Sequence, residues 1–354
     1  MTYDPFSEPA AEAAVVSSLL SEKEQDEGTS LHSFISKDMR GGIKLEAGFI
    51  GAGKVGTSLG KYFAEAKPQA GMTVKGYFSH SRNSAEDAAR FTGTKAFEDI
   101  EALVRECDVI FLTVPDGRIN QVWHQIRRYS IKGKSICHCS GSLSSADAFD
   151  GIEETGAFGY SVHPLFAVSD KYNAYRELAD VFFTIEGGGC TVDGQAAGSE
   201  GAYSEYTADG QKGLYIIKDF LEEMGNPVRI IDGRNKTTYH CAAAMASNLV
   251  CGLIDQSLEL MTRCGFTEAE AVRALAPILK GNMAHIAEVG PAASLTGPIE
   301  RNDTTTVKKH LECLEDDSEK ELYRLLSSRL VRMAQQRHLD RDYAGMSDML
   351  RKEK

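Results

Sequence analysis

From Leu45 onward, short apolar runs alternate along the chain with segments of helical periodicity. Six runs have the length and composition of strands: LEAGFIG, MTVKGYFS, CDVIFLTVP, GKSICHCSG, AFGYSVHP and ADVFFTIEG. The early ones are separated by the helical segments GTSLGKYFAEA, SAEDAARFTG and DIEALVREC. LYIIKDFLEEMG and PVRIID add one more helix and one more strand. Alternating strands and short helices are typical of a mostly parallel sheet covered on both faces, so we expect a doubly wound α/β domain over residues 44–232.

After Asp232 the strands stop. The segment NKTTYHCAAAMASNLVCGLIDQSLELMTRCG is one long helical stretch that ends at Gly265. Thr267 and Glu270 have the spacing of a capping box and predict the start of the next helix. Two more helical segments follow, TTTVKKHLECL and SEKELYRLLSSRLVRMAQQ. We therefore expect an all-helical second domain over residues 233–340 and a charged tail over 341–354.

Two segments lack the periodicity of a core-forming element. Residues 1–43 carry eight acidic side chains against three basic ones, which predicts a poorly ordered acidic extension. Residues 187–213 contain eight glycines, so we expect a flexible insertion there.

Charge and composition restrict the partners. The net charge of −12 disfavours nucleic acid and anionic membrane surfaces, and no apolar run approaches the roughly 20 residues that span a bilayer. The acidic N-terminus lacks the basic region of a signal or transit peptide, so we expect a cytoplasmic protein. The eight cysteines include no CxxC pair. On a strand, Cys137 and Cys139 share one face and His138 the other, so we expect no metal site.

The turn after the first strand holds three glycines at fixed spacing. Its residues are Gly51, Ala52, Gly53, Lys54, Val55 and Gly56. In a dinucleotide site the first glycine makes the tight turn, the second lets the backbone approach a pyrophosphate, and the third lets the helix pack on the strand. The helix N-terminus then presents free N–H groups to the phosphates. Because this GxGxxG lies between a strand and a helix, it predicts a Rossmann domain with a bound dinucleotide; a glycine-rich turn that binds nothing is the alternative.

The end of the second strand indicates which dinucleotide. NAD sites usually have an acidic residue there for the ribose 2′-hydroxyl, whereas NADP sites offer neutral or positive donors. This chain has Ser79, His80, Ser81 and Arg82. Arg82 can pair with a 2′-phosphate and the hydroxyls can donate to it. We therefore predict NADP as the cofactor, with NAD as the less favoured alternative. The alternative to a cofactor role is a solvated loop whose basic residue binds nothing.

Seven strings in order carry a family resemblance: GFIGAGKVGTSLG, YFSHSRNSAEDAA, FLTVPDGRI, HCSGSLSS, YSVHPLF, KTTYHCAAAMASN and LTGPIERND. Together they resemble two-domain Rossmann-like NADP oxidoreductases whose helical C-terminal domain has no assigned function. These are relatives of deazaflavin-dependent NADP reductases, pyrroline-carboxylate reductases, 6-phosphogluconate-type dehydrogenases and prephenate dehydrogenases. The resemblance implies a 6-phosphogluconate dehydrogenase-like helical domain and a homodimer formed through it. Asn302 stands where relatives tend to have glycine.

Three strand ends supply candidate site residues, because ligands of open α/β sheets bind beyond the carboxyl ends of the strands. We place Val114, Pro115 and Asp116 beside the nicotinamide ribose, and Ser140, Gly141 and Ser142 beside the substrate. His163 follows a strand and can carry the proton that accompanies hydride transfer. In the resembled prephenate dehydrogenases, a His-Pro pair in this position contacts the substrate hydroxyl. A structural role for His163 is the alternative.

The long helix supplies a second set of candidates. At helical spacing, Lys236, His240 and Ser247 fall within one stripe, flanked by Tyr239 and Asn248. Lys236 and His240 are therefore alternative candidates to His163 for the acid–base role. The other interpretation is that Lys236 is solvated and His240 packs against a neighbouring helix. In TGPIERND, Arg301 is a candidate for a substrate carboxylate, and Asp303 for the N-cap of the next helix.

These features favour an NADP-dependent oxidoreductase that acts on a small polar metabolite between the two domains. The alternatives are a prephenate- or arogenate-type dehydrogenase, which VHPLF suggests, and a non-catalytic NADP-binding sensor or scaffold. A polar stripe toward the nicotinamide favours an enzyme.

Overall fold

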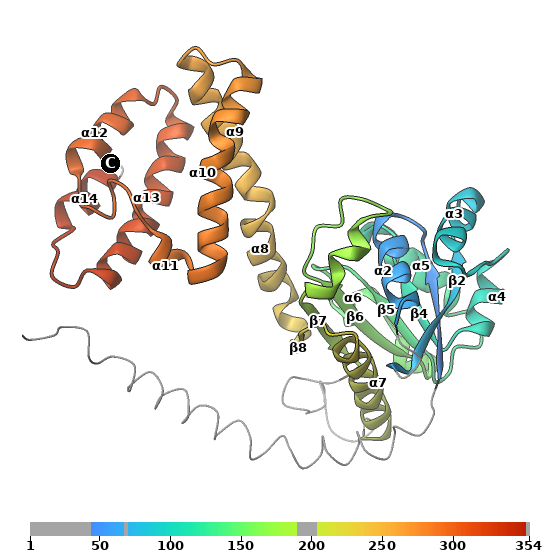
Figure 1. Ribbon diagram of the computed structural model, residues 1–354. Helices are drawn as coiled ribbons and strands as arrows, with labels where there is room; N and C mark the ends of the chain where they lie inside the picture. The colour runs from blue at the N-terminus through green and yellow to red at the C-terminus, as the bar shows by residue number, and fades with distance from the viewer. Residues whose placement is uncertain (1–43, 67–69, 190–203, 352–354) are drawn as a thin grey trace, which may run out of the picture. The chain divides into compact units, whose positions relative to one another are not determined.

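The computed structural model describes residues 44–66, 70–189 and 204–351. The described chain forms two compact units, which divide between Ala243 and Ala244 (Figure 1). This division lies within a helix and after the boundary expected at residue 232, because the first turns of that helix pack against the sheet of the first unit. The predicted acidic extension, residues 1–43, lies outside the described residues.

The first unit is built on an eight-stranded sheet with the order β3-β2-β1-β4-β5-β6-β7-β8. All neighbouring strands are parallel except β6 and β7. The first six strands have the order of a dinucleotide-binding sheet, which confirms the predicted doubly wound fold. The strands are β1 (Leu45–Ile50), β2 (Met72–Phe78), β3 (Lys95–Ala96), β4 (Val109–Leu112), β5 (Ser135–His138), β6 (Phe158–Pro164), β7 (Phe183–Gly187) and β8 (Val228–Ile230).

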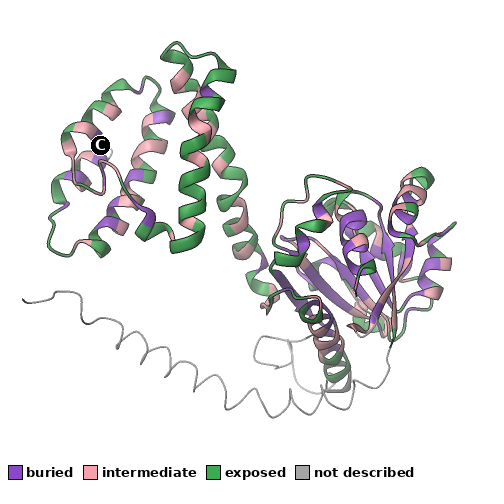
Figure 2. Cartoon of the chain, in the orientation of Figure 1, coloured by how far each residue is buried: buried purple, intermediate pink, exposed green. Residues whose placement is uncertain are grey.

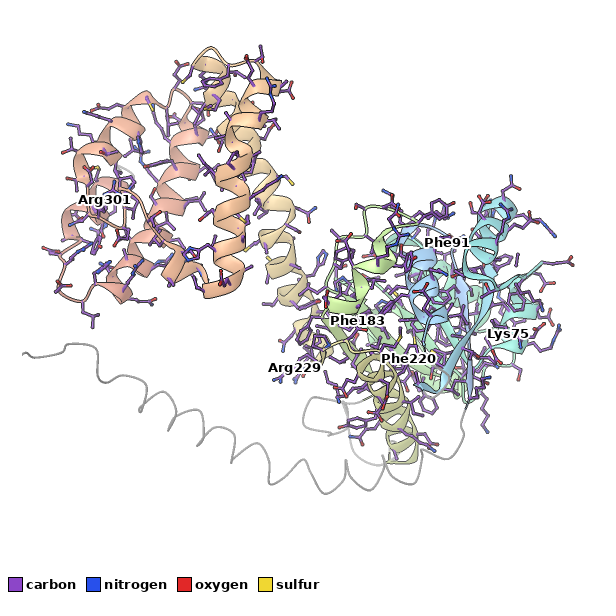
Figure 3. The ribbon with its side chains drawn as sticks, in the orientation of Figure 1. Lys75, Phe91, Phe183, Phe220, Arg229 and Arg301 are labelled. Carbon is purple, nitrogen blue, oxygen red and sulfur yellow. The ribbon has the colours of Figure 1, made fainter. Side chains whose placement is uncertain are left out.

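Helices cover both faces of this sheet. The helices are α2 (Lys54–Ala64), α3 (Arg82–Thr92), α4 (Ile100–Glu106), α5 (Asp116–Ile126), α6 (Ser145–Ala148), α7 (Ser204–Glu223) and the first turns of α8 (Lys236–Ala246), with short 3-10 turns η2 (Ile152–Thr155), η3 (Ala174–Arg176), η4 (Leu178–Asp180) and η5 (Gly233–Asn235). One core cluster joins the sheet to α2, α3 and α7, and includes Phe183 and Phe220 (Figure 3). The other joins it to α4, α5 and α6, and includes the fully buried Trp123.

The prediction of a flexible insertion over residues 187–213 is wrong for its last part, because residues 204–213 begin the helix α7. The two glycines of α7 allow close packing. A Cβ at Gly210 would lie 2.1 Å from the carbonyl oxygen of Gly188, and one at Gly213 would lie 2.2 Å from the hydroxyl of Tyr160. Gly187 itself ends β7. Residues 190–203 lie outside the described residues.

The second unit is all-helical, as expected. Its helices are the end of α8, then α9 (Asn248–Arg263), α10 (Glu268–Val289), α11 (Pro291–Ser294), α12 (Thr304–Cys313), α13 (Asp317–Arg337) and α14 (Ala344–Leu350). The capping box of Thr267 and Glu270 is confirmed at the start of α10. The charged tail expected over 341–354 is wrong where α14 lies, because Tyr343, Met346 and Leu350 are buried in the core of this unit.

The long helical stretch after Asp232 is interrupted. Ser247 has φ −123° and ψ −74°, which separates α8 from α9. By length and composition alone, Gly233–Arg263 is long and apolar enough to cross a membrane, because the small and apolar residues of α8 continue into α9. The helices α9 and α10 are mostly exposed (Figure 2).

Candidate functional site

The glycine turn joins β1 to α2 at the carboxyl end of the sheet, and its first and third glycines have no room for a side chain. Gly51 has φ +108°, and a Cβ there would lie 2.6 Å from the carbonyl oxygen of Thr113. A Cβ at Gly56 would lie 2.3 Å from Thr113 Oγ1. The Thr113 hydroxyl donates to the Gly51 carbonyl at 2.8 Å. Thr113 thus holds the turn from β4, a role that sequence reasoning missed, although it stands directly before the predicted Val114-Pro115.

The second glycine, Gly53, faces open space. No atom lies within 4 Å of a Cβ built on it, and as N-cap of α2 it provides no side-chain hydrogen bond. The first-turn amides of a helix have no intrahelical acceptor. At α2 they belong to Lys54, Val55 and Gly56, next to Ala52. An uncapped N-terminus with open space in front of it suits an anion such as a pyrophosphate.

The strand end predicted to select the cofactor lies beside this turn, because the Gly51 amide donates to the Phe78 carbonyl at the end of β2. Ser79 is half-buried there and His80 is exposed. The Ser81 hydroxyl caps α3 by accepting from the Ser84 amide. Arg82 is the first residue of α3 and is exposed. No carboxylate stands on the strand end, which agrees with the sequence argument.

Asp116 and the loop after β5 form one hydrogen-bonded cluster. Asp116 begins α5, with Pro115 as N-cap. Its Oδ2 accepts from the Ser140 hydroxyl at 2.7 Å and from the Ser142 hydroxyl at 3.2 Å. Ser140 Oγ also accepts from the amides of Ser142 and Leu143. The residues predicted for the ribose and those predicted for the substrate are therefore brought together.

The Cys137-His138-Cys139 segment has the predicted division between the two faces of the sheet. Cys137 packs in the cluster of α2 and α7, whereas His138 packs on Phe149 with ring centroids 5.4 Å apart. His138 Nδ1 accepts from the Ser140 amide, and burial lowers the pKa of His138 to about 3. His138 is therefore a neutral side chain that supports the Ser140 loop.

His163 and Tyr239 form the central pair of the site. His163 lies on β6, and its Nδ1 is 2.8 Å from the hydroxyl of Tyr239 at the start of α8. The two rings are perpendicular, with an interplanar angle of 87°. Burial lowers the pKa of His163 to about 4, with Lys236 and His240 adding to the effect. The imidazole is therefore neutral near pH 7.

Gly141 explains how the pair meets the Ser140 loop. A Cβ at Gly141 would lie 2.9 Å from His163 Nε2 and 2.7 Å from His240 Cδ2. Only a residue without a side chain lets the loop backbone approach both rings this closely. His163 and His240 thus lie against the loop that holds Ser140 and Ser142, and His240 is the more exposed of the two.

Lys236 lies beneath this group and is 1% exposed. Its Nζ donates to the Ser140 carbonyl at 2.9 Å and to the Ser161 hydroxyl at 2.8 Å. It also lies 5.6 Å from the centroid of the Tyr239 ring. Burial lowers the pKa of Lys236 to about 8, against the opposing effect of Glu186. With its ammonium engaged, Lys236 is placed to position the loop and to set the local electrostatic field.

Sequence reasoning missed two partners of Lys236 within the strands. The Ser161 hydroxyl on β6 accepts a hydrogen bond from the Lys236 ammonium, and Glu186 on β7 makes the largest negative-charge contribution to the pKa of Lys236. Glu186 is 4% exposed and accepts from the amide and hydroxyl of Ser145 at the start of α6. Burial raises the pKa of Glu186. A glutamate within the apolar run ADVFFTIEG was the available signal, since buried carboxylates need partners.

Three predicted substrate residues belong to the second unit. Ser247 and Asn248 are at the break between α8 and α9, where the Ser247 hydroxyl donates to Asn248 Oδ1. The stripe that joined Ser247 to Lys236, with Asn248 on its flank, assumed a continuous helix, and the break at Ser247 interrupts it; the substrate role of both residues stays a prediction. Arg301 is exposed on the helical unit (Figure 3), and its role stays a prediction. Asp303 is the N-cap of α12, as expected.

Comparisons with known proteins agree with this architecture. Residues 32–164 match the model of a Rossmann-like domain, and residues 205–330 match a domain of unknown function, DUF2520. The chain therefore combines a Rossmann-like domain with a C-terminal DUF2520 domain, which confirms the resemblance drawn from the motifs. A comparison with curated proteins found no match.

Solved structures share the fold. A protein from Thermotoga maritima is 25% identical with a TM-score of 0.60, over 82% of this chain and 99% of that one. A protein from Bacteroides fragilis, provisionally assigned as an NADP oxidoreductase, is 18% identical with a TM-score of 0.58, over 82% and 98%. The 1-pyrroline-5-carboxylate reductase of Streptococcus pyogenes is 13% identical with a TM-score of 0.50, over 83% and 100%.

Proposed function

We propose that the protein is an NADP-dependent oxidoreductase that transfers a hydride between NADP(H) and a small polar metabolite. The observation that carries this proposal is the uncapped N-terminus of α2 behind a glycine turn, with the His163–Tyr239 pair on the same carboxyl edge of the sheet. Ligands of doubly wound sheets bind at this edge. The fold of the structural neighbours is consistent with this activity.

The residues present fit the cofactor. The turn from Gly51 to Gly56 would hold the pyrophosphate through backbone amides, because Gly53 leaves open space there. Arg82 and Ser79 would hold the 2′-phosphate. The nicotinamide, when bound, supplies the hydride chemistry. Asp116 and the Ser140 loop would lie beside its ribose.

In this proposal His163 handles the proton. In the tautomer whose Nδ1–H donates to Tyr239, the Nε2 lone pair beside Gly141 can accept a hydrogen bond from a substrate hydroxyl and take its proton. A neutral imidazole can also polarise a carbonyl without carrying a charge. Lys236 fixes the Ser140 carbonyl and disfavours the imidazolium, and His240 stands at the exposed side. Lys236 thus acts in positioning, and His163 is the acid–base group.

Cofactor binding tests the proposal directly. Gly53→Asp places a carboxylate in open space at a φ of −78°, so the fold is kept while the phosphates are repelled. We expect NADPH, titrated by calorimetry and fluorescence, to bind wild-type protein and to lose at least about 100-fold in affinity in the variant, since charge repulsion replaces anion attraction at a helix N-terminus. Gly345→Asp, also with open space around the new Cβ, is the control. Failure of the wild type to take up either NADPH or NADH contradicts the proposal.

The sequence VHPLF supports a prephenate- or arogenate-type dehydrogenase as the alternative enzyme, since it places His163 before Pro164 at the strand end. Assays with prephenate and arogenate as hydride donors separate this alternative from other substrates. A non-catalytic NADP-binding sensor predicts binding without turnover of any metabolite tested.

We also propose that the protein forms a homodimer through the helical unit. Its helices α9 and α10 expose large apolar side chains, a feature that marks an interaction surface. They are Leu249, Leu253, Val272, Ile278, Met283 and Val289. Sedimentation analysis should give a dimer, and Ile278→Asp, at a side chain 65% exposed, should give a folded monomer.

A further inference from the structure

The arginine assigned to the 2′-phosphate already has acidic neighbours. Arg82 Nε lies 2.8 Å from Glu86 Oε1, one turn further along α3. Arg82 Nη2 lies 4.0 Å from Glu98, which follows β3. The two carboxylates raise the pKa of the Arg82 guanidinium, and Glu86 has the larger effect. All three side chains are exposed, so each can rearrange when a ligand arrives.

This arrangement differs from both usual cofactor sites. In an NAD site a carboxylate on the strand end binds the 2′-hydroxyl, and in an NADP site an arginine accommodates the 2′-phosphate. Here the strand end is free of carboxylates, whereas the arginine has one acidic neighbour on its own helix and another on the loop after β3. A 2′-phosphate that approaches Arg82 therefore meets a guanidinium that already contacts the Glu86 carboxylate. The Glu98 carboxylate lies 4.0 Å from the same guanidinium. The negative charges of the phosphate and of these carboxylates repel each other, and salt weakens this repulsion.

We propose that Glu86 is a specificity-determining residue that lowers the preference of this site for NADP over NAD; the inference rests on the proposed function. Glu86 competes with the 2′-phosphate for the Arg82 guanidinium, and it offers a carboxylate to the 2′-hydroxyl of NAD. Glu98 has the same effect with less strength, because its carboxylate is 4.0 Å away and lies on a separate loop. The preference of the site for NADP over NAD is therefore smaller than it would be if Arg82 had no acidic neighbour.

The test is the ratio of the dissociation constants of NAD and NADP, measured by calorimetry on the full chain. Glu86→Gln keeps an oxygen that accepts from Arg82 Nε and removes the charge. We expect this ratio to rise about threefold, the scale of an exposed ion pair. Adenosine 2′,5′-bisphosphate and 5′-AMP, which differ only in the 2′-phosphate, should show the same change. This pair of probes isolates the 2′ position from the nicotinamide end.

Asp87→Asn is the matched control, because it removes the same charge one residue along α3, where Asp87 pairs with Arg90 at 3.1 Å. It should leave the ratio within error of wild type. Arg82→Ala should reduce the effect of Glu86→Gln when the two are combined, because the competition for the guanidinium is then absent. A ratio that is unchanged or lower in Glu86→Gln overturns the inference while leaving the proposed function intact. If wild-type protein binds neither dinucleotide, the proposed function fails and the inference fails with it.

Discussion

Two histidine–tyrosine pairs in this molecule have almost the same geometry. His163 with Tyr239 and His310 with Tyr323 each join Nδ1 to the phenol oxygen at 2.8 Å, with perpendicular rings. The first pair lies in the sheet unit, where His163 is beside the Ser140 loop and Tyr239 is near buried Lys236. The second joins α12 to α13 in the helical unit.

The difference lies in what surrounds each pair. Burial, with Lys236 and His240, lowers the pKa of His163, and Gly141 brings a loop backbone against its Nε2. For His310, the hydrogen bond to Tyr323 joins the helices α12 and α13. The same hydrogen bond is thus part of a candidate reaction centre in one unit and a packing contact in the other. Pair geometry alone does not define a site.

The largest expected effect concerns Lys236, which distinguishes the first pair. Its pKa falls from 10.5 to about 8 on folding, so between these pH values the unfolded chain holds a proton that the folded chain has lost. Wild-type stability should therefore rise relative to Lys236→Met by about 3 kcal/mol as pH increases from 8 to 10.5. Denaturant unfolding of both proteins across this range measures it. A constant difference between them would contradict the lowered pKa.

Lys236→Met should also raise the pKa of His163, because it removes a nearby positive charge. The value should stay below 6.5, since burial is the larger cause. An NMR titration of the imidazole resonances reports this value without any substrate.

Gly141→Ala should have the next largest effect. The new methyl group would contact His163 Nε2 and His240 Cδ2 at less than 3 Å, so the rings must move. Misplacement on that scale can cost about 100-fold in turnover, while NADPH affinity should change little. Gly117→Ala, with no atom within 4 Å of the new Cβ, is the control. Equal turnover in the two variants would exclude His163 from the reaction.

Removing each phenol hydroxyl compares the two pairs directly. Tyr239→Phe should lower turnover about tenfold, because a hydrogen bond that orients His163 is lost. Tyr323→Phe should leave turnover unchanged and lower the free energy of unfolding by about 1 kcal/mol. The comparison fails if both variants change turnover alike.

The smallest expected effect is confined to the second unit. Thr267→Ala removes the capping box of α10 and should destabilise that unit by about 1 kcal/mol. The pKa of His163 should not change. Thermal unfolding followed together with the NMR signal of His163 distinguishes a local loss from a global one.

The sequence was sufficient to predict the elements that follow from a periodic pattern or from a local motif. Alternating apolar runs predicted the strands from β1 to β8 except the two-residue β3, and the glycine spacing predicted the turn at Gly51. It was insufficient where packing decides. Helix α5 was missed because it begins at Asp116, directly after the predicted strand run CDVIFLTVP, and α14 because its few apolar residues are surrounded by charges. Glycines in α7 were taken as flexibility, whereas they permit close packing.

For the site, strand ends located His163 and the Ser140 loop, because that rule follows from topology. The burial of Lys236 was missed, since helical spacing does not say which face of a helix meets the sheet. Ser161 and Glu186 stand within apolar strands, and their role depends on a lysine 75 residues away from Ser161. Ser161 carries no local signature of this partner, and Glu186 is marked only by its place within an apolar run.

The contact between Gly188 and Gly210 limits how this chain can be altered. Each carbonyl oxygen occupies the space that a methyl on the other residue would need, at 2.5 Å and 2.1 Å. A substitution at one position therefore has no compensating substitution at the other, since both are already the smallest residue available. In a mutational library these two codons should tolerate nothing else, even though they stand in the segment whose composition most resembles a linker.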